Sequence, residues 1–584
     1  MDHSKVFNGE HVDVEQLEVF ESNTGHGDFR FGNEAHIFWG RNSFQSIKKL
    51  LGYSNKLEIK NSKGRVTSIK GEDLAHLLIK GLCHEFTKYV KNSKEVDPII
   101  KNKLITNNRL SPSRAIVAVP NNYTVNKVQA MVDTIKRTKF FKEIHYVYEA
   151  EGVMMYYMNQ EWSKLASLKD KTFVVFDMGG ATINATSFRM NVITGNHNGN
   201  IYTKRISVDT VSRIGYTVGG DNIDFALINV ILGIPSVEKA LLDAYINKND
   251  LMRKQKKRLI SFVQKLKLDY IEKITGTPSE GNWVVDENSL WTQIFKLLNT
   301  DCNIVCPEAM DTNDKKYLNS DEAKGIINKL VFDCVKDAVE ELITDRFSSE
   351  IILIPSGRSI LFPGIKDAVI DTLTTSGFEV KEWDYNKSEN LQEIVKTAVV
   401  RGACWYAMHS KYIELRHDSV TSTFGYIDQV NNEVKFIPVI EKNTDLDDYG
   451  QTENVVAPMD PTISSIKFVQ MLGSNYDEIY RSEELLHKMA ELTQIPPSQI
   501  SGTVKSIKIK VDSNNNFNYE INVAGENEPI SGTCKMSDVD ITDKNSEAYA
   551  FAALSTLDDE LTSENDALKN KTMNSRSHLK KTRF

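Results

Sequence analysis

The residues best suited to chemistry lie in one stretch, residues 173–188, which reads FVVFDMGGATINATSF. Four apolar residues lead into Asp177, and Gly179, Gly180 and Thr182 follow it. Glycine in a tight turn permits positive φ and lets a ligand approach backbone N–H groups. A turn of this kind can cradle phosphates, and the Asp177 carboxylate can hold a hydrated Mg²⁺. An ordinary hairpin with a surface aspartate would look the same, so the rest of the chain must decide.

Two further loops have residue types suited to binding an anion. Gly219 and Gly220 precede a predicted helix in the segment GYTVGGDNIDFAL, with Asp221 at its start. The N-terminus of a helix attracts anions through its unpaired N–H groups, so this segment predicts a second anion site. Ser356 and Gly357 belong to PSGRSILFPG, a loop that follows an apolar strand.

The elements that must position these loops alternate between short strands and helices. Apolar runs predict strands at residues 114–120, 144–148, 202–208 and 351–354. Helical periodicity predicts helices at residues 44–51, 72–91, 149–157, 251–274 and 391–408. This alternation is typical of an α/β sheet.

The composition changes near His409, and β-type runs dominate residues 420–535. Residues 507–512 (IKIKVD) alternate strictly between apolar and charged, so one face of this strand is expected to be buried. Several such runs separated by turn clusters predict a β-sandwich. We expect residues 409–419 to form a linker and residues 482–492 a helical insertion in the sandwich. Residues 536–584 form a polar tail, expected to be partly disordered, whose basic end is either simply solvated or contacts RNA.

The whole chain of 584 residues, with a net charge of −8, has an ordinary globular composition. The negative charge argues against a DNA-binding protein. The sequence contains no apolar run of about 18 residues and no secretory signal pattern, which argues against membrane insertion and export. The six scattered cysteines predict reduced thiols in a cytoplasmic protein.

The order of six motifs resembles the ATPase domain of the heat shock protein 70 (DnaK-like) chaperones. The motifs are RAIVAVPNNYT, YVYEAEGVMMYY, VVFDMGGATINAT, GYTVGGDNID, ILIPSGRSILFPG and VVRGAC. Two later segments, TFGYIDQVNNEVKFIPVIEKNT and VKSIKIKVDSNNNFNYEINV, resemble strands of that family's peptide-binding sandwich. The resemblance implies an actin-like ATPase fold at residues 1–408, with two lobes built on ribonuclease-H-like sheets. The sandwich at residues 420–535 would follow it without a full helical lid.

The resemblance also implies a role for each matching residue. Asp177 would contact a metal-bound water, and Glu149 would lie near the metal and the attacking water. The implied cofactor is ATP or ADP with Mg²⁺. The residues that would contact the nucleotide are Gly179, Gly180, Thr182, Gly219, Gly220, Lys267, Ser356 and Gly357.

The departures from the family pattern concern catalysis. The first phosphate loop, a strand followed by Asp-Leu-Gly-Thr-Thr, is not recognisable, so the N-terminal part looks truncated or divergent. The catalytic lysine is sought in the segment after FQSIKKLLG, and no lysine there can be assigned to it. Asn184 stands at the position of an aspartate, while Gln264, Leu268 and Ile271 stand at positions of nucleotide-contacting residues. Phosphoryl transfer depends on positioned charges, so slow hydrolysis or none is expected.

The sequence therefore favours an atypical chaperone or co-chaperone that binds ATP but hydrolyses it poorly or not at all. It looks similar to the Ssz-type members, which work with a J-domain protein at the ribosome. The implied partners are a J-domain protein, another chaperone or an unfolded polypeptide. An active ATP-dependent peptide chaperone is the alternative, and a viral or structural homologue is a further one. A sugar kinase or filament protein would not explain the predicted sandwich.

Overall fold

The computed structural model describes residues 17–533 with gaps. The residues left out of this range are 22–26, 32–42, 45–46, 52–56, 61–65, 107–108, 111–113, 124, 169–170, 198–199, 276–286, 386–390, 418, 421, 431–432, 448–449, 462, 464, 472–488 and 513–516. The tail at residues 536–584, and most of the predicted helix at 482–492, therefore lie outside the described residues.

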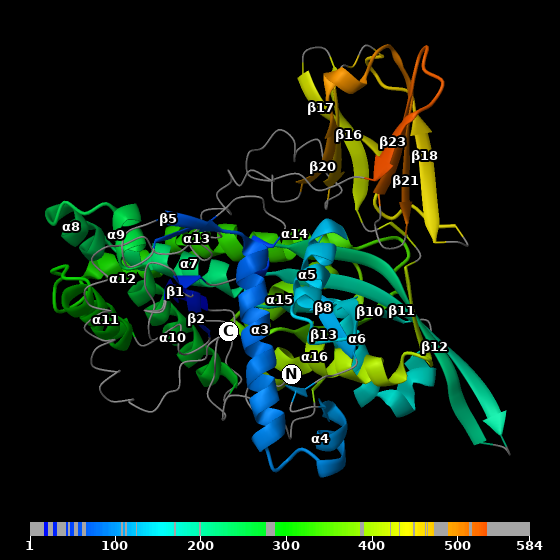
Figure 1. Ribbon diagram of the computed structural model, residues 1–584. Helices are drawn as coiled ribbons and strands as arrows, with labels where there is room; N and C mark the ends of the chain where they lie inside the picture. Colours follow the sequence, from blue (N-terminus) through cyan, green and yellow to red (C-terminus); the bar gives the residue numbers. More distant parts are fainter. Residues whose placement is uncertain are drawn as a thin grey trace.

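A six-stranded mixed sheet forms the centre of the α/β part (Figure 1). Its order is β14-β13-β10-β11-β12-β15, in which β10, β11 and β12 form an antiparallel meander and β13 runs parallel to β10. The predicted strands at 202–208 and 351–354 are confirmed as parts of β12 and β13. The bounds are β10 Thr172–Met178, β11 Ile183–His197, β12 Asn200–Tyr216, β13 Glu350–Ser356, β14 Glu379–Glu382 and β15 Ile413–His417.

Helices cover both faces of this sheet. Val174, Phe176 and Met178 of β10 belong to the core that includes helices α7 (Gly220–Leu232), α14 (Asp333–Leu342) and α15 (Ile365–Thr375). Phe173 and Val175 point to the opposite face, as the two-residue period of a strand requires, and join the core of α6 (Glu149–Gln160) and α16 (Leu391–His409). All seven residues of β10 are therefore buried, which explains the unbroken apolar run that leads into Asp177.

Helices α6 and α16 pack against each other through two glycines. A Cβ atom on Gly402 would lie 1.8 Å from the carbonyl oxygen of Gly152, so only glycine permits this crossing. The crossing holds α6 against the sheet and thereby fixes its first residue, Glu149.

The N-terminal part of the chain forms several small sheets of two or three strands, with helices beside them. Strands β8 (Arg114–Val119) and β9 (Glu143–Tyr148) pair in parallel through the crossover helix α5 (Val125–Arg137). Their core also contains residues of helix α3 (Gly71–Asn92) and of the short 3₁₀-helix η1 (Ile47–Leu50). The remaining elements are β1 Leu17–Glu21, β2 Gly27–Phe31, β3 Ser43–Phe44, β4 Leu57–Lys60, β5 Val66–Ile69, α4 Pro98–Leu104, β6 Ile105–Thr106, β7 Arg109–Leu110 and η2 Trp162–Leu168.

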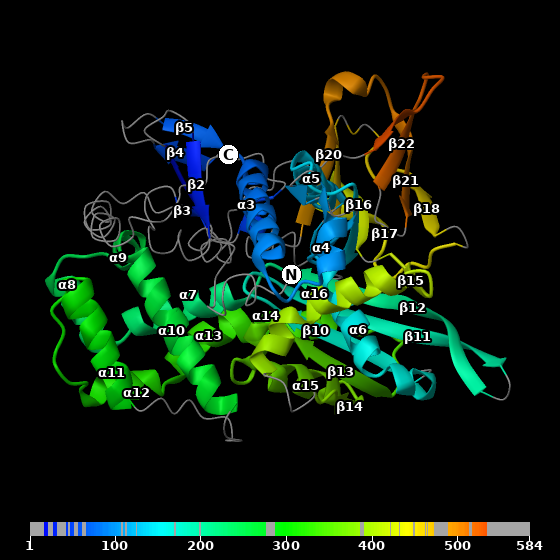
Figure 2. The ribbon, with the colours of Figure 1, turned by 60° about the horizontal axis from the view of Figure 1, so that its bottom comes forward.

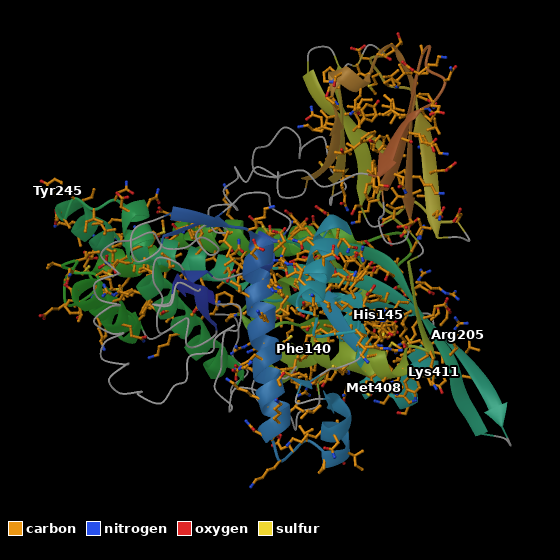
Figure 3. All side chains as sticks on the ribbon, viewed as in Figure 1. Phe140, His145, Arg205, Tyr245, Met408 and Lys411 are labelled. Carbon is orange, nitrogen blue, oxygen red and sulfur yellow. The ribbon has the colours of Figure 1, made fainter. Side chains whose placement is uncertain are left out.

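A group of helices extends from one end of the six-stranded sheet (Figure 2). The single helix predicted over residues 251–274 is two helices, because the chain leaves helical geometry at Gln255. The side chain of Tyr245, at the outer end of this group, is 97% exposed (Figure 3). The bounds are α8 Pro235–Asp243, α9 Lys248–Lys254, α10 Lys256–Thr275, α11 Glu287–Phe295, η3 Lys296–Asp301, α12 Thr312–Leu318, α13 Asp321–Ile327 and η4 Asn328–Phe332. The 3₁₀-helix η5 (Arg358–Leu361) lies elsewhere, directly after β13.

No single helix among the described residues has the length and apolarity needed to cross a membrane. The bent pair α7–α8 meets those criteria only when its two helices are counted together, across a bend of 73°. Most residues of α7 are buried in the core between the sheet and the neighbouring helices, which explains its apolar composition.

Two four-stranded antiparallel sheets follow and share one core, as the sandwich prediction requires. The aromatic rings of Phe424 and Phe468, from one sheet, pack on Phe517 of the other. The first sheet contains β16 Thr423–Val430, β17 Glu433–Ile440, β19 Ile466–Met471 and β20 Met489–Ile495. The second contains β18 Gln451–Val456, β21 Val504–Asp512, β22 Phe517–Val523 and β23 Ile530–Thr533. The single-turn helix η7 (Pro497–Gln499) precedes β21.

Two sequence predictions in this region need correction. The helix predicted over residues 482–492 is wrong for Met489–Leu492, which lie in β20. Pairing with β19 satisfies the backbone there, and Leu492 and Ile495 enter the shared core, so packing overrides helical periodicity. The segment expected to be a linker, residues 409–419, contains β15, which pairs in parallel with β12 of the central sheet.

The sandwich packs against the α/β part next to α14 and β12. The Lys442 ammonium is buried and donates a 2.7 Å hydrogen bond to the carbonyl oxygen of Glu341. Arg346 forms an ion pair with Asp445. The Ser419 hydroxyl donates to the Val211 carbonyl oxygen at 3.2 Å.

Candidate functional site

A row of polar residues crosses the centre of the six-stranded sheet. Asn184 on β11 lies opposite Asp177 on β10 and Gly215 on β12, and Asp177 lies opposite Ser356 on β13. Residues directly opposite each other on neighbouring strands share one face of a sheet. The turn after β8 packs closely against this row. A Cβ atom on Gly215 would lie only 2.3 Å from the backbone nitrogen of Asn122.

The Asn184 side chain connects the acidic residues of the row. Its Nδ2 group donates to Glu149 Oε2 at 2.6 Å, to Asp177 Oδ2 at 3.3 Å and to Thr182 Oγ1 at 3.2 Å. Its Oδ1 atom accepts a hydrogen bond from the backbone N–H of Asn121 at 2.8 Å, which fixes the orientation of the amide. Asn184 is fully buried, Asp177 is 4% exposed and Glu149 is 7% exposed.

A lysine that the sequence analysis missed completes this cluster. Lys48 Nζ lies 3.0 Å from Glu149 Oε1 and forms an ion pair with it. The Tyr123 hydroxyl donates to the Lys48 carbonyl oxygen at 2.7 Å and holds that turn in place. Lys48 belongs to the predicted short helix at residues 44–51, which directly precedes the segment expected to contain the catalytic lysine. The two adjacent lysines in FQSIKKLLG were therefore the sequence feature that could have pointed to Lys48.

Burial and the neighbouring Glu149 carboxylate raise the pKa of Asp177 from 3.8 to about 7. Hydrogen bonds from Asn184 and Ser356 and the charge of Lys48 oppose this rise. The raised pKa of Asp177 therefore has two causes, its burial and the second carboxylate beside it.

The glycine turn of the hairpin packs directly on the start of helix α7. The backbone N–H groups of Gly220 and Asp221 donate to the carbonyl oxygens of Gly179 and Gly180 at 3.0 and 2.8 Å. The N–H group of Gly219 donates to Asn222 Oδ1 at 3.1 Å. These N–H groups are the ones predicted to bind an anion, and here each has a protein acceptor.

Lys267, which the resemblance predicts to contact the nucleotide, lies on helix α10 beside this turn, and its ammonium is engaged within the protein. Lys267 Nζ lies 2.6 Å from Asp224 Oδ1 and donates to the Gly220 carbonyl oxygen at 3.1 Å. Burial raises the pKa of Asp224, while Lys267 and a hydrogen bond from Gln264 act against that rise. The pair is therefore a buried ion pair between two helices.

Ser356 and Gly357 lie beside Asp177. The Ser356 hydroxyl hydrogen-bonds to Asp177, and its oxygen also lies 3.4 Å from the Val395 carbonyl oxygen. Gly357 has a φ of +79°, and a Cβ atom there would lie 2.2 Å from the Met178 carbonyl oxygen, so this turn requires glycine. The ten residues named by the sequence analysis therefore form one continuous neighbourhood.

The donors present do not fit a divalent metal ion in this arrangement. The described residues contain no group of three or more His, Cys, Asp or Glu side chains that could hold one. Both Glu149 oxygens and Asp177 Oδ2 accept hydrogen bonds from Lys48 or Asn184. Mg²⁺ requires oxygen ligands, and an ammonium and an amide N–H repel it.

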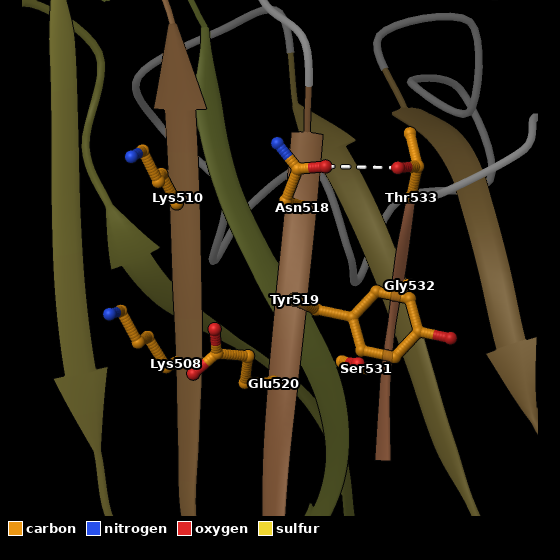
Figure 4. A pocket seen from close by; sticks show the side chains of 8 residues that line it. All are labelled: Lys508, Lys510, Asn518, Tyr519, Glu520, Ser531, Gly532 and Thr533. Atoms are coloured by element: carbon orange, nitrogen blue, oxygen red, sulfur yellow. Dashed lines mark hydrogen bonds between the residues drawn. The ribbon is translucent and has the colours of Figure 1, made fainter. Parts of the chain in front are cut away.

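A separate hollow of about 270 Å³ lies on the outer face of the second sandwich sheet (Figure 4). Most of the residues that line it are charged or polar. Lys508 forms an ion pair with Glu453 at 3.0 Å, and the Thr533 hydroxyl donates to Asn518 Oδ1 at 2.9 Å.

No model of a known protein family matches the chain, and no curated protein matches it.

Proposed function

We propose that the chain is a divergent, non-hydrolysing relative of the heat shock protein 70 chaperones that acts as a scaffold or co-chaperone in the cytoplasm. It assists protein folding or assembly through a partner protein, namely a J-domain protein, another chaperone or an unfolded polypeptide, with the ribosome as one setting. DNA and membranes are not among its proposed partners.

The resemblance of the motifs is supported by three features of the fold. The meander β10-β11-β12, followed by β13 and β14 in parallel, is the strand arrangement expected of a ribonuclease-H-like sheet. A β-sandwich follows this α/β part along the chain, as it does in the chaperones. The hairpin turn and the α7 start also meet where the resemblance requires two phosphate-binding segments to meet.

The non-hydrolysing part of the proposal rests on the hydrogen bonds that the Glu149 and Asp177 carboxylates accept. Lys48 and Asn184 engage Glu149, and Asn184 also engages Asp177. Acids held in this way do not position a metal ion or an attacking water, and phosphoryl transfer depends on that positioning. The Gly220 and Asp221 N–H groups are hydrogen-bonded to the hairpin and do not face a phosphate.

Single-turnover hydrolysis of radiolabelled ATP by the full chain tests this conclusion. We expect no release of phosphate above the rate of the buffer alone. In parallel, light scattering by a chemically unfolded reporter protein should fall when the chain is added, to the same extent with and without ATP. ATP hydrolysis that disappears in Asp177→Asn would contradict the proposal.

One observation favours the alternative, an active ATP-dependent chaperone. Lys48 lies beside Glu149, so the lysine that the sequence analysis failed to assign is available near the acidic residues. The alternative predicts that Lys48→Met abolishes a hydrolysis rate that the unchanged chain displays.

A further inference from the structure

Side chains of the protein itself bind the two carboxylates of the candidate site through hydrogen bonds and an ion pair. Glu149 Oε1 accepts from Lys48 at 3.0 Å, and Glu149 Oε2 accepts from Asn184 at 2.6 Å. Asp177 Oδ2 accepts from Asn184 at 3.3 Å. A divalent ion would have to displace an ammonium and an amide to reach the same oxygens.

These groups come from two halves of the α/β part. Lys48 lies in η1. Ile47, which precedes it, and Leu51, which follows the end of η1, belong to the core around β8, β9 and α5. Asn184 and Asp177 lie on the six-stranded sheet, and Glu149 begins α6, which packs on that sheet.

The backbone of Asn121 adds a second link between the two halves. Its N–H group donates to Asn184 Oδ1, and its side chain donates to the carbonyl oxygens of Ala185 and Ile214 and to the hydroxyl of Thr186. The cluster and Asn121 therefore both join one half to the other.

The residue type at position 184 decides the charge of the cluster. Glu149, Asp177 and Lys48 carry two negative charges and one positive charge when all are ionised. An aspartate at position 184 would add a third carboxylate within hydrogen-bonding distance of the other two, because Asn184 Nδ2 lies 2.6 and 3.3 Å from their oxygens. Carboxylates that approach so closely repel each other unless a cation lies between them.

We propose that Lys48 and the Asn184 amide take the place of a divalent cation, so that the two halves of the α/β part stay joined without magnesium. The inference rests on the proposed function only in regarding this cluster as the place where the resembled chaperones hold their metal. It concerns the folded chain without nucleotide and is tested without ATP.

The test uses Asn184→Asp in the full chain, with Mn²⁺ as a paramagnetic probe and thermal unfolding as a second readout. The unchanged chain should leave the electron paramagnetic resonance signal of free Mn²⁺ undiminished, and its unfolding midpoint should be equal in Mg²⁺ and in EDTA. The variant should unfold earlier in EDTA and recover when Mg²⁺ is added. It should bind Mn²⁺ at least about tenfold more tightly than the unchanged chain, which corresponds to about 1.4 kcal/mol.

Asn518→Asp is the matched control, because it adds the same charge at an exposed position of β22 and keeps the acceptor for Thr533. Its Mn²⁺ binding and midpoint should equal those of the unchanged chain. If Asn184→Asp does not fold, Lys48→Met removes the ammonium from the cluster instead and should also make the midpoint depend on Mg²⁺.

Stabilisation of the unchanged chain by Mg²⁺, or Mn²⁺ binding equal to that of Asn184→Asp, would overturn the inference. ATP hydrolysis would refute the proposed function but leave these measurements unaffected, since they contain no nucleotide. The two failures can therefore be told apart.

Discussion

The ion pair between Lys267 and Asp224 offers the sharpest choice between a structural role and a nucleotide-binding role. The two charged atoms lie 2.6 Å apart, and the side chains are 14% and 6% exposed. Removing one partner of such a pair leaves an unpaired buried charge, which costs about 3–5 kcal/mol. We expect Lys267→Met to destabilise the α/β part by about 3 kcal/mol at neutral pH, near the lower limit because Lys267 keeps some contact with water.

The loss should become smaller as the pH falls. Burial already raises the pKa of Asp224 above its usual value of 3.8, and the loss of Lys267 removes the charge that opposes this rise. A group with a raised pKa in the folded state favours folding at low pH and loses that contribution as the pH rises through the folded pKa. The difference between Lys267→Met and the unchanged chain should therefore be largest at pH 7 and shrink toward pH 4.

Urea unfolding followed by circular dichroism, with the midpoint compared across this pH range, measures the effect. Lys265→Met is the matched control, because Lys265 is an exposed lysine on the same helix and should change stability by less than about 0.5 kcal/mol. The double variant Lys267→Met with Asp224→Asn should recover most of the lost stability. A Lys267→Met chain as stable as the unchanged one, with a loss confined to nucleotide binding, would refute the structural role.

Three further predictions concern stability alone, each measured by urea unfolding. Gly402→Ala should lower stability by about 1–3 kcal/mol or more, because the added Cβ would lie 1.8 Å from a backbone oxygen of α6; Gly325→Ala, with open space around it, should cause no loss. Asp177→Asn should gain stability relative to the unchanged chain as the pH rises from 3.8 to about 7. The reason is that it removes a carboxylate whose raised pKa disfavours folding in this range. A stability difference between the two chains that stays constant with pH would contradict the raised pKa. Tyr245→Gly should raise stability by about 1 kcal/mol, because Tyr245 has a φ of +56° at the end of α8 and its exposed side chain has no packing to lose; a loss would point to an unrecognised contact.

Local patterns in the sequence predicted the elements well where the backbone itself carries the signal. The apolar run before Asp177 and the glycines after it became β10 and its turn, and the strict alternation in residues 507–512 became part of β21. The helix predicted at residues 482–492 failed at Met489–Leu492, because pairing with β19 and burial in the sandwich core are invisible to local periodicity.

The sequence analysis selected the residues of the candidate site but not the contacts among them. The sequence named Glu149, Asp177 and Lys267 through their resemblance to chaperone motifs. It also noted asparagine at position 184. It did not reveal that Asn184 bridges the two carboxylates, because that requires β10, β11 and α6 to be placed together.

The amino-acid sequence by itself determined the glycine hairpin, the alternation of strands and helices, and the change to a β-sandwich, because these depend on neighbouring residues. Only the tertiary structure decided which charges meet. Lys48 and Glu149 are separated by 101 residues, and Asn121 and Asn184 by 63. Packing of separate elements brings such residues together, and burial then makes each polar group depend on the partner it finds there.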